Sequence, residues 1–357
     1  GGLAMSRYVI SGYYGFGNAG DEAILQAIID SLQSHDSGAD ITVFSAQPSK
    51  TALEHQVRAV HRTSFAQIVA ALRQADLFIS GGGGLLQDAT SNRSLLYYLG
   101  LLTLARGLGC KTMVYANSIG PIKRTCNKRL ACYVLEKTDF ITVRDQLSLN
   151  LLAELGVHKP QIQLTADPAL LLPSPVVAPE ERVIALAVRE WPSQHDFLME
   201  IAIAGRRLVQ DGFSILLIPF HFARDLAVSQ RLAQEIGAGA SCLMQAQSFD
   251  DLVIGLARSE VVVAMRLHAL IMGAVCNRPL IGISYDPKIE GFLQSVGQPI
   301  AGSTADLQAD HLYELVLAAY NQRVEVRSNL AELLVKLRQY ADKNAIIATS
   351  LAGGERA

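Results

Sequence analysis

An arginine and a histidine stand two residues apart in the segment Arg266-Leu267-His268. The apolar run before it, 261–265, predicts a strand, and residues 269–274 predict a helix. In α/β folds, ligands lie outside the carboxyl ends of parallel strands, where such a turn occurs. Residues two apart in an extended segment face the same side, so we expect Arg266 and His268 to point together into a cleft and Leu267 into the core. A permanent cation beside a group that titrates near neutral pH suits anion binding and proton transfer. The structural alternatives are a surface ion pair for Arg266 and a helix cap for His268.

A glycine-rich segment, residues 12–21, follows the first predicted strand and opens a helix. Its backbone amides, among them those near Gly15 and Asn18, can approach an anion. The glycines fall at positions 12, 15, 17 and 20, which is not the GxGxxG spacing of dinucleotide sites. Asp21 is expected to cap a helix that begins at Glu22, or alternatively to accept a proton from a bound hydroxyl.

Four glycines in a row, residues 81–84, follow another predicted strand. Such a run has no side-chain bulk, and its backbone can adopt dihedral angles that other residues avoid. Ordering this flexible backbone on folding costs conformational entropy. We interpret Gly82 and Gly83 as positions where the backbone approaches a ligand, with a tight turn as the alternative.

Other polar residues also stand at predicted strand ends. Arg144 is expected beside the cleft, or in an ion pair with a neighbouring acid such as Asp145, which is predicted to cap the next helix. Lys288 near a helix start indicates an anion, with a Lys288–Glu290 ion pair as the alternative. The weaker candidates are Asn117, with simple turn chemistry as its alternative, and His221.

The bulk composition limits the function classes. The chain has 357 residues, which suits two domains. A net charge of −2 argues against a general nucleic-acid binder. The five cysteines form no CxxC pair, and no HExxH motif is present, so a metal site is not supported. No signal peptide and no apolar run of about 18 residues is visible, which predicts a cytoplasmic protein.

Short apolar runs alternate with helical patterns along most of the chain, which is typical of parallel sheets covered by helices. A proline-rich stretch, residues 172–179, interrupts the alternation and is interpreted as a linker. We therefore expect an α/β protein with two Rossmann-like domains and a central cleft. The expected parts are residues 5–172, residues 180–322 and a C-terminal helix at 323–351.

Five stretches together resemble the polysaccharide pyruvyl transferase family, and particularly its CsaB-type bacterial cell-wall members. They are residues 12–24 (GYYGFGNAGDEAI), 80–87 (SGGGGLLQ), 141–145 (ITVRD), 265–279 (MRLHALIMGAVCNRP) and 282–292 (GISYDPKIEGF). The resemblance implies a GT-B-like architecture in which the C-terminal helix returns to the first domain. Arg144 matches the arginine of the family's VRD-like motif, and Arg266 and His268 match its RLH motif.

The resemblance also implies the reaction. Members transfer a pyruvyl group from phosphoenolpyruvate to a sugar as a cyclic ketal, with no cofactor. For the CsaB type, the acceptor is a β-N-acetylmannosamine residue of a lipid-linked secondary cell-wall polymer precursor, and the 4,6-ketal supports S-layer anchoring. Arg144 and Arg266 can hold the carboxylate and phosphate bidentately, and His268 is the expected general acid/base. Lys288 would assist phosphate departure, and Asp21 would orient or deprotonate the acceptor hydroxyl.

Two alternatives belong to other classes. A GT-B glycosyltransferase would use a nucleotide sugar, and Glu290 could then bind the ribose. A non-catalytic module would bind anionic polymers, which the net charge of −2 disfavours. A lipid-linked acceptor implies peripheral contact with the inner face of the plasma membrane. The apolar residues 95–105 are expected to form a buried helix packed on a sheet. A helix that contacts lipid is the alternative interpretation.

Overall fold

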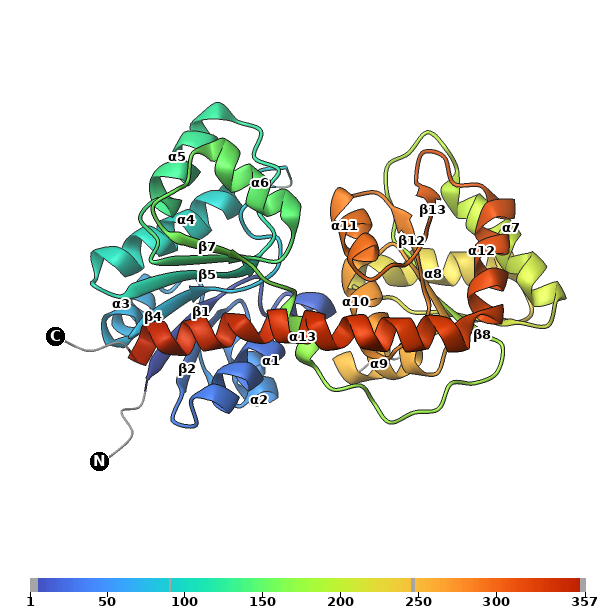
Figure 1. Cartoon of the computed structure of the whole chain (residues 1–357), viewed down its shortest axis with the longest axis horizontal. Coiled ribbons are helices and arrows are strands. Elements are labelled where there is room, and N and C mark those ends of the chain that lie inside the picture. The colour runs from blue at the N-terminus through green and yellow to red at the C-terminus, as the bar shows by residue number, and fades with distance from the viewer. Residues whose placement is uncertain (1–5, 90, 245–247, 354–357) are drawn as a thin grey trace. The chain divides into compact units, whose positions relative to one another are not determined.

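The computed structural model describes residues 6–89, 91–244 and 248–353. Residue 5, where the first domain was expected to begin, lies outside this range. The chain forms two compact units (Figure 1). Unit 1 comprises Gly1–Leu171 with Leu337–Ala357, and unit 2 comprises Leu172–Lys336.

Unit 1 contains a seven-stranded sheet in the order β3-β2-β1-β4-β5-β6-β7. Every described strand pair in it is parallel. Helices cover both faces (Figure 1), so the inner strands are buried along most of their length and not only at alternate residues. The strands are β1 (Arg7–Ser11), β2 (Asp40–Ser45), β3 (Arg58–His61), β4 (Leu77–Ser80), β5 (Lys111–Asn117), β6 (Phe140–Val143) and β7 (Gln161–Leu164). The helices are α1 (Ala19–His35), α2 (Pro48–His55), α3 (Phe65–Gln74), α4 (Asn92–Gly107), α5 (Thr125–Leu135), α6 (Gln146–Leu155) and the short η1 (Pro168–Leu171).

Unit 2 repeats this plan with a six-stranded parallel sheet in the order β10-β9-β8-β11-β12-β13. The strands are β8 (Val183–Ala187), β9 (Ser214–Leu217), β10 (Ala240–Cys242), β11 (Val261–Ala264), β12 (Leu280–Ser284) and β13 (Ile300–Ser303). The helices are α7 (Phe197–Gln210), α8 (Phe222–Ile236), α9 (Phe249–Ala257), α10 (Leu267–Val275), α11 (Pro287–Ser295) and α12 (Ala309–Asn321). The strand order reverses direction between β1 and β4 in unit 1 and between β8 and β11 in unit 2. Such switch points are where open α/β sheets bind ligands.

The last helix, α13 (Arg323–Gly353), is continuous, and its residues from Leu337 onward belong to unit 1. Within unit 2, Arg327 pairs with the buried Glu260. Within unit 1, the buried Asn344 accepts a hydrogen bond from the Thr165 hydroxyl at 2.9 Å. Each part of α13 is therefore tied to its own unit by specific polar contacts.

The predicted helix at residues 95–105 is a core element. Leu95, Tyr98, Leu99 and Leu102 of α4 are each at most 2% exposed and pack in the unit 1 core. This confirms that one face of the helix packs in the core, while Leu96 on the other face is exposed. Among the described residues, no helix combines the length and apolar character needed to cross a bilayer.

Within the part of the chain that the structure describes, the nine inner strands match predicted strands, whereas the four edge strands were not predicted. β3 and β7 flank the first sheet, and β10 and β13 flank the second. These strands have three or four residues each and are largely half-buried or exposed. An edge strand is covered less fully, so its sequence lacks the apolar run that marks an inner strand.

Candidate functional site

The Arg266-Leu267-His268 segment is the start of a helix and not an extended strand end. α10 begins at Leu267, so Arg266 is its N-cap residue and His268 lies in its first turn. The expectation based on alternating strand residues is therefore wrong, and Leu267 is half-buried instead of lying in the core. Arg266 and His268 still stand at the carboxyl end of β11, beside the switch point of the second sheet.

A buried carboxylate on α8 holds the Arg266 side chain. Nε of Arg266 donates to Asp225 at 2.9 Å, and Nη2 donates to the other carboxylate oxygen. The Asp225 side chain is 1% exposed and also accepts the backbone N–H of His221 at 2.9 Å. Arg266 thus forms an ion pair, as the structural alternative predicted, but its partner is a buried aspartate and the pair does not lie on the surface. It orients the guanidinium and, among the described residues, leaves Nη1 without a carboxylate partner.

His221 lies next to this pair, at the end of the segment that follows β9. Burial lowers the pKa of its imidazole, and the positive charges of Arg266 and Arg224 lower it further. Its Nδ1 is buried and has no hydrogen-bond partner among the described residues. The structure therefore favours a neutral imidazole here.

Lys288 and Glu290 lie at the start of α11, after β12. The Asp286 side chain caps this helix by accepting the Lys288 backbone N–H at 3.0 Å. Glu290 accepts a hydrogen bond from the Ser284 hydroxyl at 2.7 Å. Unit 2 thus gathers Arg266, His268 and Lys288 at the carboxyl ends of the adjacent strands β11 and β12.

In unit 1, Arg144 follows β6 and pairs with Asp167, which follows β7. Their side chains are 7% and 4% exposed. The expected alternative partner, Asp145, instead caps α6 by accepting the Ser148 N–H at 2.8 Å, which confirms its predicted capping role. In each unit, an arginine at a strand end is therefore paired with a buried aspartate.

Asp21 does not cap α1. The helix begins at Ala19, and Asn18 is the N-cap, accepting the Gly20 N–H at 3.2 Å. The Asn18 side-chain amide donates to the Asp21 carboxylate. The predicted cap was one turn too late because Asn18 already provides the accepting oxygen.

Burial raises the pKa of Asp21 to about 7, and the negative charges of Glu22 and Asp167 act in the same direction. The nearby positive charge of Arg144 opposes this shift. An aspartate with a pKa near neutrality can both accept and return a proton at cellular pH. Asp21 is therefore suited to proton transfer as well as to hydrogen bonding.

The glycine positions have structural reasons of their own. The Gly15 amide donates to Glu22 at 2.8 Å. A Cβ on Gly82 would lie 2.8 Å from the Ile24 side chain, and Gly83 has a φ of +99°. Asn117 is fully buried and donates to the carbonyls of Ser80 and Gly81 at 3.1 and 2.8 Å. Close packing and backbone bonding thus already require small residues and an amide here, without any ligand.

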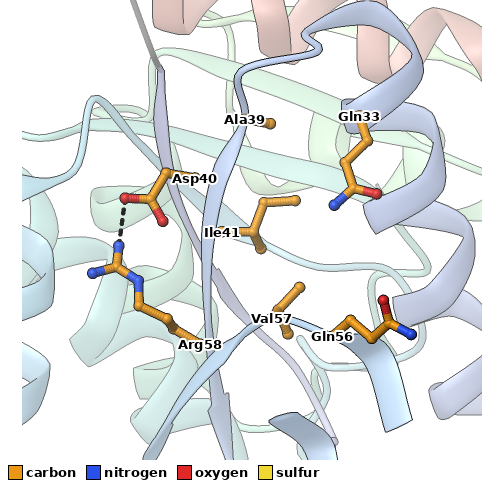
Figure 2. Close-up of a pocket in the computed structure, with 7 residues that line it drawn as sticks. All are labelled: Gln33, Ala39, Asp40, Ile41, Gln56, Val57 and Arg58. Carbon is orange, nitrogen blue, oxygen red and sulfur yellow. Dashed lines mark hydrogen bonds and ion pairs between the residues drawn. The ribbon is translucent and has the colours of Figure 1, made fainter. Parts of the chain in front are cut away.

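The surface depression in Figure 2 is distinct from these clusters. It has a volume of about 260 Å³ and lies where β2 and β3 begin, beside the exposed Arg58–Asp40 ion pair. That edge is opposite the carboxyl ends of the strands, so the depression does not contain the candidate residues. Across the described ranges, no cluster of three or more His, Cys, Asp or Glu residues could hold a metal ion.

Replacing Asp21 with asparagine should change the pH dependence of stability. Between the ordinary aspartate pKa of 3.8 and about 7, the unfolded chain releases a proton that the folded chain keeps. The free energy of unfolding of the native chain therefore falls as pH rises through this window. Asp21→Asn cannot titrate at this position and so lacks this loss. The free energy of unfolding of the variant, relative to that of the native chain, should therefore rise between pH 4 and pH 7, by at most about 4 kcal/mol.

Urea unfolding of both proteins at several pH values measures this difference. Asp30→Asn, on the exposed surface of the same helix, controls for losing a carboxylate from α1. A stability difference that stays constant from pH 4 to 7 would contradict the raised pKa.

Comparison with known proteins agrees with the fold and identifies the family. A glycosyltransferase from Rickettsia africae has a TM-score of 0.68 at 11% identity, covering 99% of this chain and 100% of that one. HepE from Anabaena, in complex with UDP and glucose, has a TM-score of 0.64 at 13% identity, with 97% and 99% covered. At these identities the likeness shows the fold, which is the GT-B-like architecture expected from the sequence.

Sequence relatives are more specific. The amylovoran biosynthesis protein AmsJ of Erwinia amylovora is 21% identical over 410 residues, covering 94% of this chain and 97% of the relative. The model of the polysaccharide pyruvyl transferases matches residues 18–287, a range that includes Arg144, Arg266 and His268. The chain therefore belongs to the polysaccharide pyruvyl transferase family and is a pyruvyltransferase enzyme.

Proposed function

We propose that the enzyme transfers the pyruvyl group of phosphoenolpyruvate to a β-N-acetylmannosamine residue of a lipid-linked secondary cell-wall polymer precursor. The product is a 4,6-ketal, which would serve S-layer anchoring, and phosphate is released. The observation that supports pyruvyl transfer is the family match over a range that includes Arg266, paired with its buried aspartate, and His268 in the first turn of α10. The acceptor and the S-layer role are proposed from the resemblance of the motifs to the CsaB type. The lipid-linked acceptor implies work at the inner face of the plasma membrane.

The reaction places defined demands on the residues. Protonation of the methylene carbon C3 of phosphoenolpyruvate makes C2 an oxocarbenium centre, which the first sugar hydroxyl attacks. The C2–O bond to phosphate then breaks, and the second hydroxyl closes the ring at C2. Of the two protons lost from the hydroxyls, one is balanced by the proton gained at C3, and the other leaves with phosphate.

We assign the donor to unit 2. Arg266 binds an anionic group of phosphoenolpyruvate through the N–H groups that Asp225 leaves available. His268 carries the proton to or from the reacting atoms, and Lys288 assists phosphate departure. These assignments are supported by the common position of the three side chains at the ends of β11 and β12.

We assign the acceptor to unit 1. Asp21, with its pKa of about 7, accepts the proton of an acceptor hydroxyl. Arg144 is held by Asp167 as Arg266 is held by Asp225, and it contributes positive charge to the reaction. Asn18 donates to the Asp21 carboxylate, and Gly83 lies beside it. Gly15, Gly82 and Asn117 are assigned to acceptor binding with them.

Phosphate release tests the proposal. The purified chain is given phosphoenolpyruvate with a β-N-acetylmannosamine glycoside that carries a lipid-like aglycone. We expect acceptor-dependent phosphate release, and about a hundredfold or greater loss for Arg266→Ala, because a bidentate charge-assisted contact is removed. The matching N-acetylglucosamine glycoside, which differs only at C2, measures acceptor selectivity.

Other results would redirect the assignment. Release that is equal with both glycosides would retain pyruvyl transfer and reject the N-acetylmannosamine acceptor. No release with either, together with UDP release from a UDP-sugar, would favour the nucleotide-sugar transferase. Glu290, at the start of α11, would then be the residue to test for ribose binding.

A further inference from the structure

We propose that Arg189 is an anion-binding residue of the donor site in unit 2, held in position by Trp191 and Tyr285. The inference rests on the proposed function, because it assigns Arg189 to the phosphate or carboxylate of phosphoenolpyruvate. Neither the sequence motifs nor the spacing of charged residues singled out this arginine.

The sheet register places Arg189 and Arg266 at equivalent positions. Ala187, at the end of β8, pairs with Ala264, at the end of β11. Arg189 and Arg266 each follow their strand by two residues, and neighbouring strands lie about 4.8 Å apart. The two arginines therefore leave the sheet side by side at its switch point, where α/β sheets bind ligands.

The Arg189 side chain crosses the end of β11. Its Nη1 donates to the Tyr285 hydroxyl at 2.9 Å, and Tyr285 directly follows β12. Since β11 lies between β8 and β12 in the sheet, this hydrogen bond spans the strand end from which Arg266 and His268 continue. The Arg189 guanidinium is thus directed toward the proposed donor residues.

Two aromatic rings hold the guanidinium. Its central carbon lies 5.0 Å from the ring centroid of Trp191 and 4.8 Å from that of Tyr285, and the two rings are 4.5 Å apart. The loop is tied down beyond Trp191, because the Ser193 hydroxyl donates to the Thr304 carbonyl at 2.7 Å. Such contacts reduce the rotamer entropy lost on ligand binding.

The charge of Arg189 is not neutralised by a carboxylate within the described part of the chain. Its two hydrogen bonds go to neutral groups, the Glu190 carbonyl and the Tyr285 hydroxyl. The Glu190 carboxylate lies 3.8 Å from Arg231 instead, whereas Arg266 is neutralised by Asp225. A guanidinium that is fixed, half-buried and uncompensated favours a bound anion and retains N–H groups to donate to it.

Direct binding tests the inference without requiring turnover. Titration calorimetry measures phosphoenolpyruvate binding to the native chain, to Arg189→Gln and to Arg182→Gln. Arg182 is a matched control, because it precedes β8 at the opposite edge and also stacks on an aromatic ring, that of Phe213 at 5.3 Å. We expect Kd to rise about ten- to hundredfold for Arg189→Gln and to stay unchanged for Arg182→Gln.

Trp191 supplies an independent readout, since it is the chain's single tryptophan. It is 39% exposed, so ligand binding at Arg189 should change its fluorescence in the native chain and in Arg182→Gln. If Arg189→Gln does not fold, Arg189→Lys keeps the charge but loses the planar fork, and it should weaken binding by a smaller factor.

The outcomes separate the two hypotheses. Native-like binding of phosphoenolpyruvate by folded Arg189→Gln or Arg189→Lys would overturn the inference, while phosphate release by the native chain would leave the proposed function standing. If the native chain neither binds phosphoenolpyruvate nor releases phosphate, the proposed donor is wrong and the assignment of Arg189 falls with it.

Discussion

Replacing His268 with alanine is expected to lower kcat by about a hundred- to ten-thousandfold, the usual contribution of a general acid or base. His268 lies in the first turn of α10, beside Arg266 at the end of β11. Pyruvyl transfer requires a proton at C3 and the removal of protons from two hydroxyls, and neither arginine can supply them near neutral pH. KM for phosphoenolpyruvate should change much less than kcat, because the anion is held by other groups.

Initial rates of phosphate release over a range of pH provide the measurement. The kcat profile of the variant should differ in shape from the native one, because one proton-transfer group is missing, whereas loss of packing alone would lower kcat equally at every pH. His311→Ala, on the exposed side of α12, is the matched control and should retain native kcat. A folded His268→Ala with native kcat would assign proton transfer to another residue, of which Asp21 is the first candidate.

Replacing Asp225 with alanine should destabilise unit 2 by about 3–5 kcal/mol, because it leaves the partly buried Arg266 charge without its partner. The backbone N–H of His221 would lose its acceptor as well. For a unit of this size the change corresponds to a fall in Tm of roughly 10 °C. Thermal and urea unfolding measure it.

A matched surface pair controls for loss of an Asp–Arg contact. Asp310 pairs with Arg207, and the Asp310 side chain is 85% exposed, so Asp310→Ala should cost under about 1 kcal/mol. The double variant Asp225→Ala with Arg266→Ala should be less destabilised than the two single changes together, because no unpaired charge remains. Equal costs for Asp225→Ala and Asp310→Ala would show that burial does not strengthen the Asp225–Arg266 pair.

The sequence was informative about the sheets where burial is complete. Strands such as β4 and β11 are buried at every residue, and a continuous apolar run of that length has few other uses. The edge strands β3 and β10 carry polar residues and escaped detection. The Asp145 helix cap was also predictable from the sequence, because it depends only on the backbone N–H of Ser148, three residues later.

The start of α1 shows how a local rule fails. Asn18 and Asp21 are both good capping residues, and each precedes a helical pattern. Which of the two residues caps the helix depends on the surroundings of Asp21. Its side chain is buried close to Gly83, and its pKa is shifted by the charges of Arg144 and Asp167. Those neighbours come from other strand ends and are not visible in the local sequence.

The sequence by itself determined the α/β architecture, the inner strands and the motif residues Arg144, Arg266 and His268. These features could be predicted because they depend on apolar periodicity and on motif spacing, which are local properties of the sequence. Only the tertiary structure decided the partners, since Asp167 lies 23 residues from Arg144, Asp225 lies 41 from Arg266, and Tyr285 lies 96 from Arg189. Parallel strands bring such distant residues to one sheet edge, and their charges and hydrogen bonds depend on that proximity and not on their order along the chain.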